Sequence, residues 1–142
     1  MNGPAIGIGC TMLGLMDVVI ASDRATFHVP FTSLALTPEA CSSRTFPKIM
    51  GNSMANEMLL FNRKLSAEEA LSKGFVSQVL AHDTLESETT SHLSSLACLP
   101  SSALQYSKVR PESLKDANTA NAVWGTFSIS GEHFGPKFTL FC

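Results

Sequence analysis

Charged residues, paired cysteines and long apolar runs are scarce in this 142-residue chain, and each scarcity excludes a class of protein. Only 15% of the residues are charged, and 10 basic residues against 12 acidic ones give a net charge of −2. Lys and Arg are scattered rather than clustered, so we expect no nucleic-acid partner. Asp17 interrupts the longest apolar run, so we expect no membrane span.

Targeting and metal-binding patterns are also lacking. The N-terminus has neither the basic nor the apolar region of a secretory signal, and Leu140-Phe141-Cys142 is not a peroxisomal tripeptide signal. The cysteines are far apart and form no C-x-x-C pair, which favours reduced thiols in an intracellular protein. The four histidines are dispersed without H-E-x-x-H spacing, so we predict no metal site.

The hydrophobic pattern of the first 50 residues predicts a few short strands and two helices. With 44% apolar residues, the chain is large enough for one domain with a core. Residues 5–16 are apolar almost all round, which predicts a buried helix. Residues 17–21 and 26–29 are predicted to be strands. Thr37 as N-cap and Pro38 in the first turn predict a helix that runs to about Met50.

The remaining pattern is mainly helical. Gly51 ends the helix before it, and Asn52 is predicted to cap a helix whose buried face holds Ala55, Met58 and Leu59. Residues 66–69 form a predicted capping box, with Gly74 as the stop of that helix. Further predictions are an extended segment at 75–80 and helices at 83–96, at 101 or 102 to 108, and at 118–124. Periodicity alone indicates an α/β or α+β fold.

Two features of the first 41 residues suggest chemistry. Closely spaced glycines permit a sharp turn, and a helix that begins there leaves peptide N–H groups free to face a bound oxygen. Glu39 adds a carboxylate. A backbone donor for a developing oxyanion and one acid/base carboxylate are the minimum for enolate chemistry. A dinucleotide site is excluded because Gly14 has the wrong spacing for G-x-G-x-x-G.

Six motifs follow one another between residues 2 and 108: NGPAIG at 2–7, ASDRATF at 21–27, LTPEACSS at 36–43, FPKIMG at 46–51, KLSAEEA at 64–70 and GFVS at 74–77. This ordered series resembles the crotonase (enoyl-CoA hydratase/isomerase) superfamily. The Δ3,Δ2-enoyl-CoA isomerase type of peroxisomes and mitochondria is most similar, followed by the chromodomain Y-like crotonase domains.

The resemblance implies a fold and a setting. It implies an α/β crotonase-like ββα superhelix, present in part because the family's preceding strands are missing, followed by a C-terminal helical region. We therefore expect residues 1–142 to form a single partial domain in which residues 109–142 are a divergent tail. The family implies an acyl-CoA thioester substrate that carries its own coenzyme A, so no separate cofactor is expected. It also implies a homo-oligomer, a trimer by resemblance, in peroxisomes or mitochondria.

The resemblance also implies site residues. In the isomerase type, a glutamate matching Glu39 is a base that moves a proton between C2 and C4, and the N–H matching Ile8 lies in the oxyanion hole. The hydratase type has two glutamates that activate and deliver water, and the matching positions here hold Thr11 and Phe31 instead. The resemblance therefore favours isomerisation over hydration. Phe31, Leu34 and Phe46 are candidates for an acyl pocket.

Structural alternatives stay open for each of these residues. Glu39 is also typical of the first turn of a helix, Ile8 of an ordinary buried helix start, and the apolar candidates of a core. Ala40 replaces the glycine that usually follows the catalytic glutamate, and a positive φ there would strain the backbone. Two other hypotheses remain. One is a crotonase-like interaction module similar to the chromodomain Y-like domains, which lack a glutamate in the matching motif. The other is an unstable fragment without activity.

Overall fold

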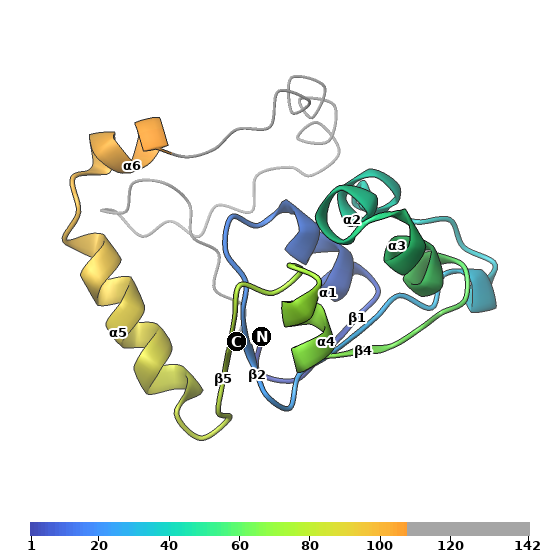
Figure 1. Cartoon of the computed structure of the whole chain (residues 1–142), viewed down its shortest axis with the longest axis horizontal. Helices are drawn as coiled ribbons and strands as arrows, with labels where there is room; N and C mark the ends of the chain where they lie inside the picture. Colours follow the sequence, from blue (N-terminus) through green and yellow to red (C-terminus); the bar gives the residue numbers. More distant parts are fainter. Residues whose placement is uncertain (108–142) are drawn as a thin grey trace. The chain divides into compact units, whose positions relative to one another are not determined.

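The computed structural model describes residues 1–107 of the chain (Figure 1). These residues belong to two compact units, one formed by residues 1–91 and one that begins at His92. All strands of the described residues lie in the first unit, as do both candidate catalytic groups, Ile8 and Glu39. The prediction of a helix at 118–124 and the predicted divergent tail lie outside the described residues.

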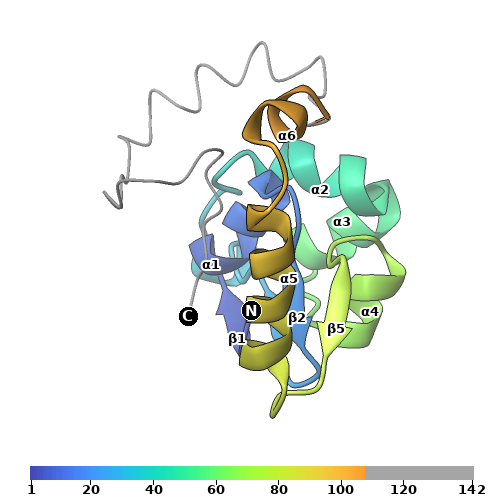
Figure 2. The ribbon, with the colours of Figure 1, turned by 90° about the vertical axis from the view of Figure 1, so that its left-hand side faces the viewer.

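Two small sheets form the centre of the first unit (Figures 1 and 2). In one sheet, β1 (Pro4–Ile6) pairs in parallel with β3 (Thr26–His28), which pairs antiparallel with β4 (Leu65–Ser66). In the other, β2 (Ile20–Ser22) and β5 (Gln78–Leu80) are parallel. The strands predicted at 17–21, 26–29 and 75–80 are therefore confirmed as elements, with bounds shifted or shortened by up to three residues.

The apolar segment 5–16 does not form the single buried helix that we predicted. It contains part of β1, a four-residue α1 (Ile8–Thr11) and a 3-10 helix η1 (Met12–Leu15). Ile6 and Leu15 are exposed to 56% and 43%. Glycine weakens a helix interior, and this segment holds three glycines, so short pieces replace a long helix.

Helices α2 (Ser42–Met50) and α3 (Asn52–Leu59) follow a second 3-10 helix, η2 (Thr32–Leu34). Gly51, with φ of 80°, ends α2 as predicted, but it also caps α3, so Asn52 is the first helical residue and not a side-chain cap. The predicted buried face of α3 is confirmed, because Ala55, Met58 and Leu59 are all at most 5% exposed.

Helix α4 (Ala67–Ser72) begins with the predicted capping box. The Ser66 side chain accepts from the Glu69 N–H, and the Glu69 carboxylate accepts from the Ser66 N–H at 3.0 Å. Gly74, with φ of 73°, follows the end of the helix as predicted. Arg63 forms ion pairs with Glu57 and Glu69. The hydrogen bond from the Ser66 N–H lowers the pKa of Glu69, and the Arg63 guanidinium lowers it further. While the Glu69 carboxylate is ionised, Arg63 therefore links α3 to α4.

Three aromatic rings connect the first sheet to α2. Phe75 packs edge-on against Phe27 of β3, with ring centroids 5.6 Å apart, and against Phe46 of α2 at 5.1 Å. All three residues are at most 3% exposed. T-shaped contacts of this kind add to the stability gained from burial.

The last described elements are α5 (Leu85–Ala97) and α6 (Ser101–Ser107). They match the helices predicted at 83–96 and from Ser101 onward. Leu85, Leu93 and Leu96 share one face of α5 and are half-buried, while none of its residues is buried. Among residues 1–107, no helix has the length and apolar content that a membrane span requires.

Candidate active site

A glycine turn places the candidate oxyanion donor at the start of α1. Gly7 has φ of 56° and ψ of −123°, a conformation that glycine adopts readily and other residues avoid. Its N–H donates to the His28 carbonyl at 2.9 Å, and its carbonyl accepts from the N–H groups of Cys10 and Thr11. Among the described residues, the Ile8 N–H has no acceptor, as expected in a first helical turn. The group is therefore free to bind an oxygen, and its role in an oxyanion hole stays a prediction.

Glu39 lies on an exposed, non-helical stretch. Residues 32–39 are all exposed, and residues 36–39 have no regular structure. The Glu39 carbonyl accepts the Ser42 N–H at 3.0 Å, whereas its carboxylate has no partner within residues 1–107. Within the described residues the side chain is therefore exposed to solvent. Its role as the base stays a prediction.

The start predicted for the helix after Glu39 is wrong. We predicted Thr37 as the N-cap and Pro38 in the first turn, but α2 begins at Ser42. Ala40 and Cys41 have φ of 47° and 57°, and two consecutive left-handed residues cannot continue a right-handed helix. Glu39 is therefore not in the first turn of α2, and the dipole interpretation of that residue is wrong.

The strain predicted at Ala40 is present, because its φ is positive. The left-handed conformation costs a non-glycine residue about 1–2 kcal/mol, while glycine loses about 0.5–1 kcal/mol in backbone entropy. Ala40→Gly should therefore raise the free energy of unfolding by about 0.5–1 kcal/mol, seen as a higher urea midpoint at an unchanged slope. Ala55→Gly, a matched change inside α3, should lower the midpoint. A lower midpoint for Ala40→Gly would contradict the strain.

The three acyl-pocket candidates lie in different environments. Phe31 and Phe46 are 2% and 0% exposed and belong to the core, whereas Leu34 is 61% exposed on η2. The alternative to an acyl pocket, a place in the core, is therefore confirmed for the two phenylalanines. A part in binding an acyl chain stays a prediction for all three. Thr11, at the other position that matches a hydratase glutamate, is fully buried and donates to the Ile8 carbonyl at 3.3 Å.

Close packing links the glycine turn to the Glu39 region. Helix α2 lies beside the α1–η1 segment (Figures 1 and 2), and the two approach closely at Gly14. A Cβ at Gly14 would lie 2.8 Å from Thr45 Oγ1 and 3.2 Å from Thr45 Cβ. The spacing of Gly14 excluded a dinucleotide site, but the sequence contained no signal for this contact with α2.

Two features of polar side chains in the first unit were missed by sequence reasoning. Ser42 Oγ, in the first turn of α2, is buried without a hydrogen-bond partner among residues 1–107. Ser22 Oγ lies 3.2 Å from His82 Nδ1 and joins the ends of β2 and β5. In the described part of the chain, no three metal-ligating side chains converge. Ser22 and His82 are 60 residues apart, so no local sequence signal predicts their contact.

The buried thiol of Cys10 should be unreactive in the folded chain. Burial raises the pKa of Cys10 to about 12, and a backbone hydrogen bond with His28 opposes this only in part. At pH 8 its thiolate fraction is about one in ten thousand, and only the thiolate is nucleophilic. A maleimide at pH 8 should label the exposed Cys41 and Cys98 and reach Cys10 only in denaturant, as peptide mass spectrometry would show. Labelling of native Cys10 at the rate of Cys41 would contradict its burial.

Comparisons with known proteins agree on one family. The family model described as "Enoyl-CoA hydratase/isomerase" matches residues 1–122. Enoyl-CoA delta isomerase 2 of Rattus norvegicus is 54% identical over 108 residues, which are 76% of this chain and 28% of that protein. Enoyl-CoA delta isomerase 3, peroxisomal, of Mus musculus is 47% identical over 124 residues, which are 86% of this chain and 39% of the relative.

Other relatives widen the comparison. Chromodomain Y-like protein of Homo sapiens is 47% identical over 108 residues, covering 76% of this chain and 18% of that protein. The crystal structure of an enoyl-CoA hydratase/isomerase from Pseudoalteromonas atlantica T6c has a TM-score of 0.76 and 39% identity, over 87% of this chain and 48% of that one. The chain thus spans between 28% and 39% of the two isomerase relatives and about half of this solved structure.

Proposed function

The chain belongs to the enoyl-CoA hydratase/isomerase family and has its α/β fold, and from this premise we propose that it acts as an enoyl-CoA isomerase. The reaction would move the double bond of a 3-enoyl-CoA to the 2-trans position in fatty-acid β-oxidation. The substrate brings its own coenzyme A, so no further cofactor is needed. By the name of the peroxisomal relative, we propose a peroxisomal or mitochondrial setting, and by family a homo-oligomer, as a trimer.

The proposal depends most on the Glu39 carboxylate, which is exposed and has no partner among residues 1–107. In the proposed reaction, Glu39 removes a proton from C2, and the electron pair delocalises into the thioester carbonyl as an enolate. The same carboxylic acid then delivers the proton to C4, so that the C2–C3 double bond forms as the C3–C4 double bond is lost. One carboxylate on an accessible segment suffices for such a shuttle.

The Ile8 N–H is the second proposed participant. It would donate to the thioester oxygen as negative charge develops there, and one such donor is commonly worth about 3–4 kcal/mol of transition-state stabilisation. The free N–H at the Gly7 turn supports this role. The packing of Gly14 on Thr45 further supports it, because it ties the segment after Ile8 to the helix after Glu39.

Hydration is not part of the proposal. The family's hydratase type uses two glutamates to activate and deliver water, and the matching positions hold Thr11 and Phe31. Incubation with a 3-enoyl-CoA should therefore give the conjugated 2-trans-enoyl thioester, followed by its ultraviolet absorbance. Incubation with a 2-trans-enoyl-CoA should give no 3-hydroxyacyl product by mass spectrometry. A hydroxyacyl product without isomerisation would overturn the assignment.

An interaction module is the second candidate. The similarity to chromodomain Y-like proteins favours it, since 45–47% identity over 108 residues is close to that of the isomerases. Glu39 favours the enzyme, because the chromodomain Y-like domains lack a glutamate in the matching motif. A cooperatively folded chain that binds an acyl-CoA but turns over no 3-enoyl-CoA would support the module instead.

A further inference from the structure

A hydroxyl group on η2 contacts a turn that lies almost 30 residues further along the chain. Thr32 Oγ1 is 3.0 Å from the Leu60 carbonyl oxygen and 2.9 Å from Asn62 Oδ1. One hydroxyl proton can serve both acceptors only as a shared, weaker bond. A half-turn of the Asn62 amide resolves this, because its NH2 group then donates to Thr32 while Thr32 donates to Leu60. We call this pair of hydrogen bonds the Thr32–Asn62 clamp.

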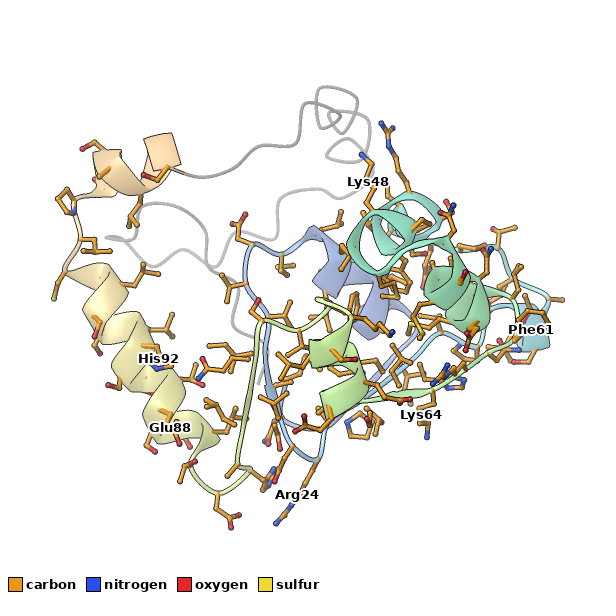
Figure 3. The ribbon with its side chains drawn as sticks, in the orientation of Figure 1. Arg24, Lys48, Phe61, Lys64, Glu88 and His92 are labelled. Atoms are coloured by element: carbon orange, nitrogen blue, oxygen red, sulfur yellow. The ribbon has the colours of Figure 1, made fainter. Side chains whose placement is uncertain are left out.

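The turn on the far side of the clamp is well anchored. Asn62 has φ of 56°, a left-handed conformation that asparagine tolerates better than most residues. Arg63 follows it and pairs with Glu57 of α3 and with Glu69 of α4. Figure 3 shows Phe61 on the same turn, where its ring is 78% exposed. The clamp therefore attaches η2 to a turn that two helices hold in place.

On the near side, η2 leads directly to the candidate base. The Leu36 N–H donates to the carbonyl of the buried residue Phe31 at 2.8 Å, and the Ala35 N–H donates to the Thr32 carbonyl at 3.2 Å. Ala35 is left-handed, so the end of η2 has the bonding pattern of a Schellman motif. Residues 36–39 follow, which we call the Glu39 segment, and Ala40 and Cys41 connect this segment to α2.

The Glu39 segment has few other restraints. Beyond the Leu36 N–H, its hydrogen bonding within residues 1–107 consists of the Glu39 carbonyl accepting from Ser42. All four of its residues are exposed. The orientation of the Glu39 carboxylate thus depends on how the two ends of the Glu39 segment are held, one by η2 and the other by α2.

From this arrangement we infer that Thr32 and Asn62 are positioning residues for Glu39. Their side-chain hydrogen bonds join η2 to the turn after α3 and do not involve Glu39. They act through η2, which the clamp fixes against the turn after α3. The inference rests on the proposed function, in which Glu39 transfers a proton between two carbons. Proton transfer needs close alignment, and displacement by about 1 Å can cost roughly a hundredfold in rate.

Four variants test the clamp. Thr32→Val keeps the shape but removes the hydroxyl, and Asn62→Gly keeps the left-handed turn but removes the amide. Thr32→Ser keeps the hydroxyl. Thr37→Val makes the same chemical change at an exposed threonine of the Glu39 segment that has no hydrogen bond within residues 1–107. Hydrogen–deuterium exchange of peptides covering residues 33–41 and steady-state isomerase kinetics are measured for each full chain.

Thr32→Val and Asn62→Gly should each speed exchange over residues 33–41 and lower kcat by roughly tenfold or more, with KM within about twofold. Thr32→Ser and Thr37→Val should match the wild type in both measurements. Unchanged exchange in the first two variants would overturn the inference. So would faster exchange with an unchanged kcat. If the wild type has no turnover, the proposed function fails, and the exchange data alone decide whether the clamp orders the Glu39 segment.

Discussion

Glu39→Gln should lower the isomerase kcat by at least about a hundredfold and leave KM nearly unchanged. The carboxamide has the size of the carboxylate but cannot accept the C2 proton, and a general base typically contributes about 10²- to 10⁴-fold. The side chain has no partner within residues 1–107, so the substitution removes no internal contact of that region. The loss should therefore appear in turnover at an unchanged melting temperature.

Glu68→Gln is the matched control for that substitution. Glu68 is likewise exposed, in the first turn of α4, and its change to Gln should leave kcat at the wild-type value. Glu39→Asp, with its carboxylate withdrawn by one methylene, should retain part of the activity. A Glu39→Gln rate within tenfold of the wild type would mean that another group takes the proton.

An isotope experiment tests the single-base shuttle directly. With a substrate deuterated at C2, a carboxylic acid that delivers the proton it has just taken should place part of the deuterium at C4. Product without deuterium at C4 would indicate complete exchange with water or a second acid. Mass spectrometry of the product distinguishes these outcomes, which depend on where the proton goes and not on how fast the chain turns over.

Local signals in the sequence predicted several elements well. The capping box at Ser66 and Glu69 needs only four consecutive residues, and Gly51 and Gly74 stop helices through their own backbone freedom. Strand β3 was found because β-prone residues follow a polar turn. Each of these signals acts over a few residues, so tertiary packing had little to override.

The predictions that failed depended on contacts that the local pattern does not contain. A helix start at Thr37 had a favourable cap and proline, but Ala40 and Cys41 turn left-handed before α2 begins. A continuous helix over residues 5–16 gives way to β1, whose Ala5 pairs with Phe27. The Thr32–Asn62 clamp joins residues 30 positions apart. The sequence thus pointed to candidate residues, whose roles stay predictions, but not to how their backbone is held.

The aromatic contact between the sheet and α2 should dominate the stability of the first unit. Phe75→Ala removes a ring that is 3% exposed and packs against both Phe27 and Phe46. Substitutions of this kind cost about 3–5 kcal/mol, a large part of the 5–15 kcal/mol that typically separates folded from unfolded domains. The urea midpoint of Phe75→Ala should therefore fall steeply, or the chain should fail to fold cooperatively.

Two further variants make that result interpretable. Phe61→Ala removes a ring that is 78% exposed and should change the free energy of unfolding by no more than about 0.5 kcal/mol. Phe75→Leu keeps most of the buried volume and should fall between the two, which gives a measurable value even if Phe75→Ala does not fold. Equal midpoints for Phe75→Leu and the wild type would contradict a role for edge-on ring contacts. Because Phe46 lies on the helix that follows Glu39, Phe75→Leu should also lower kcat more than Phe61→Ala does.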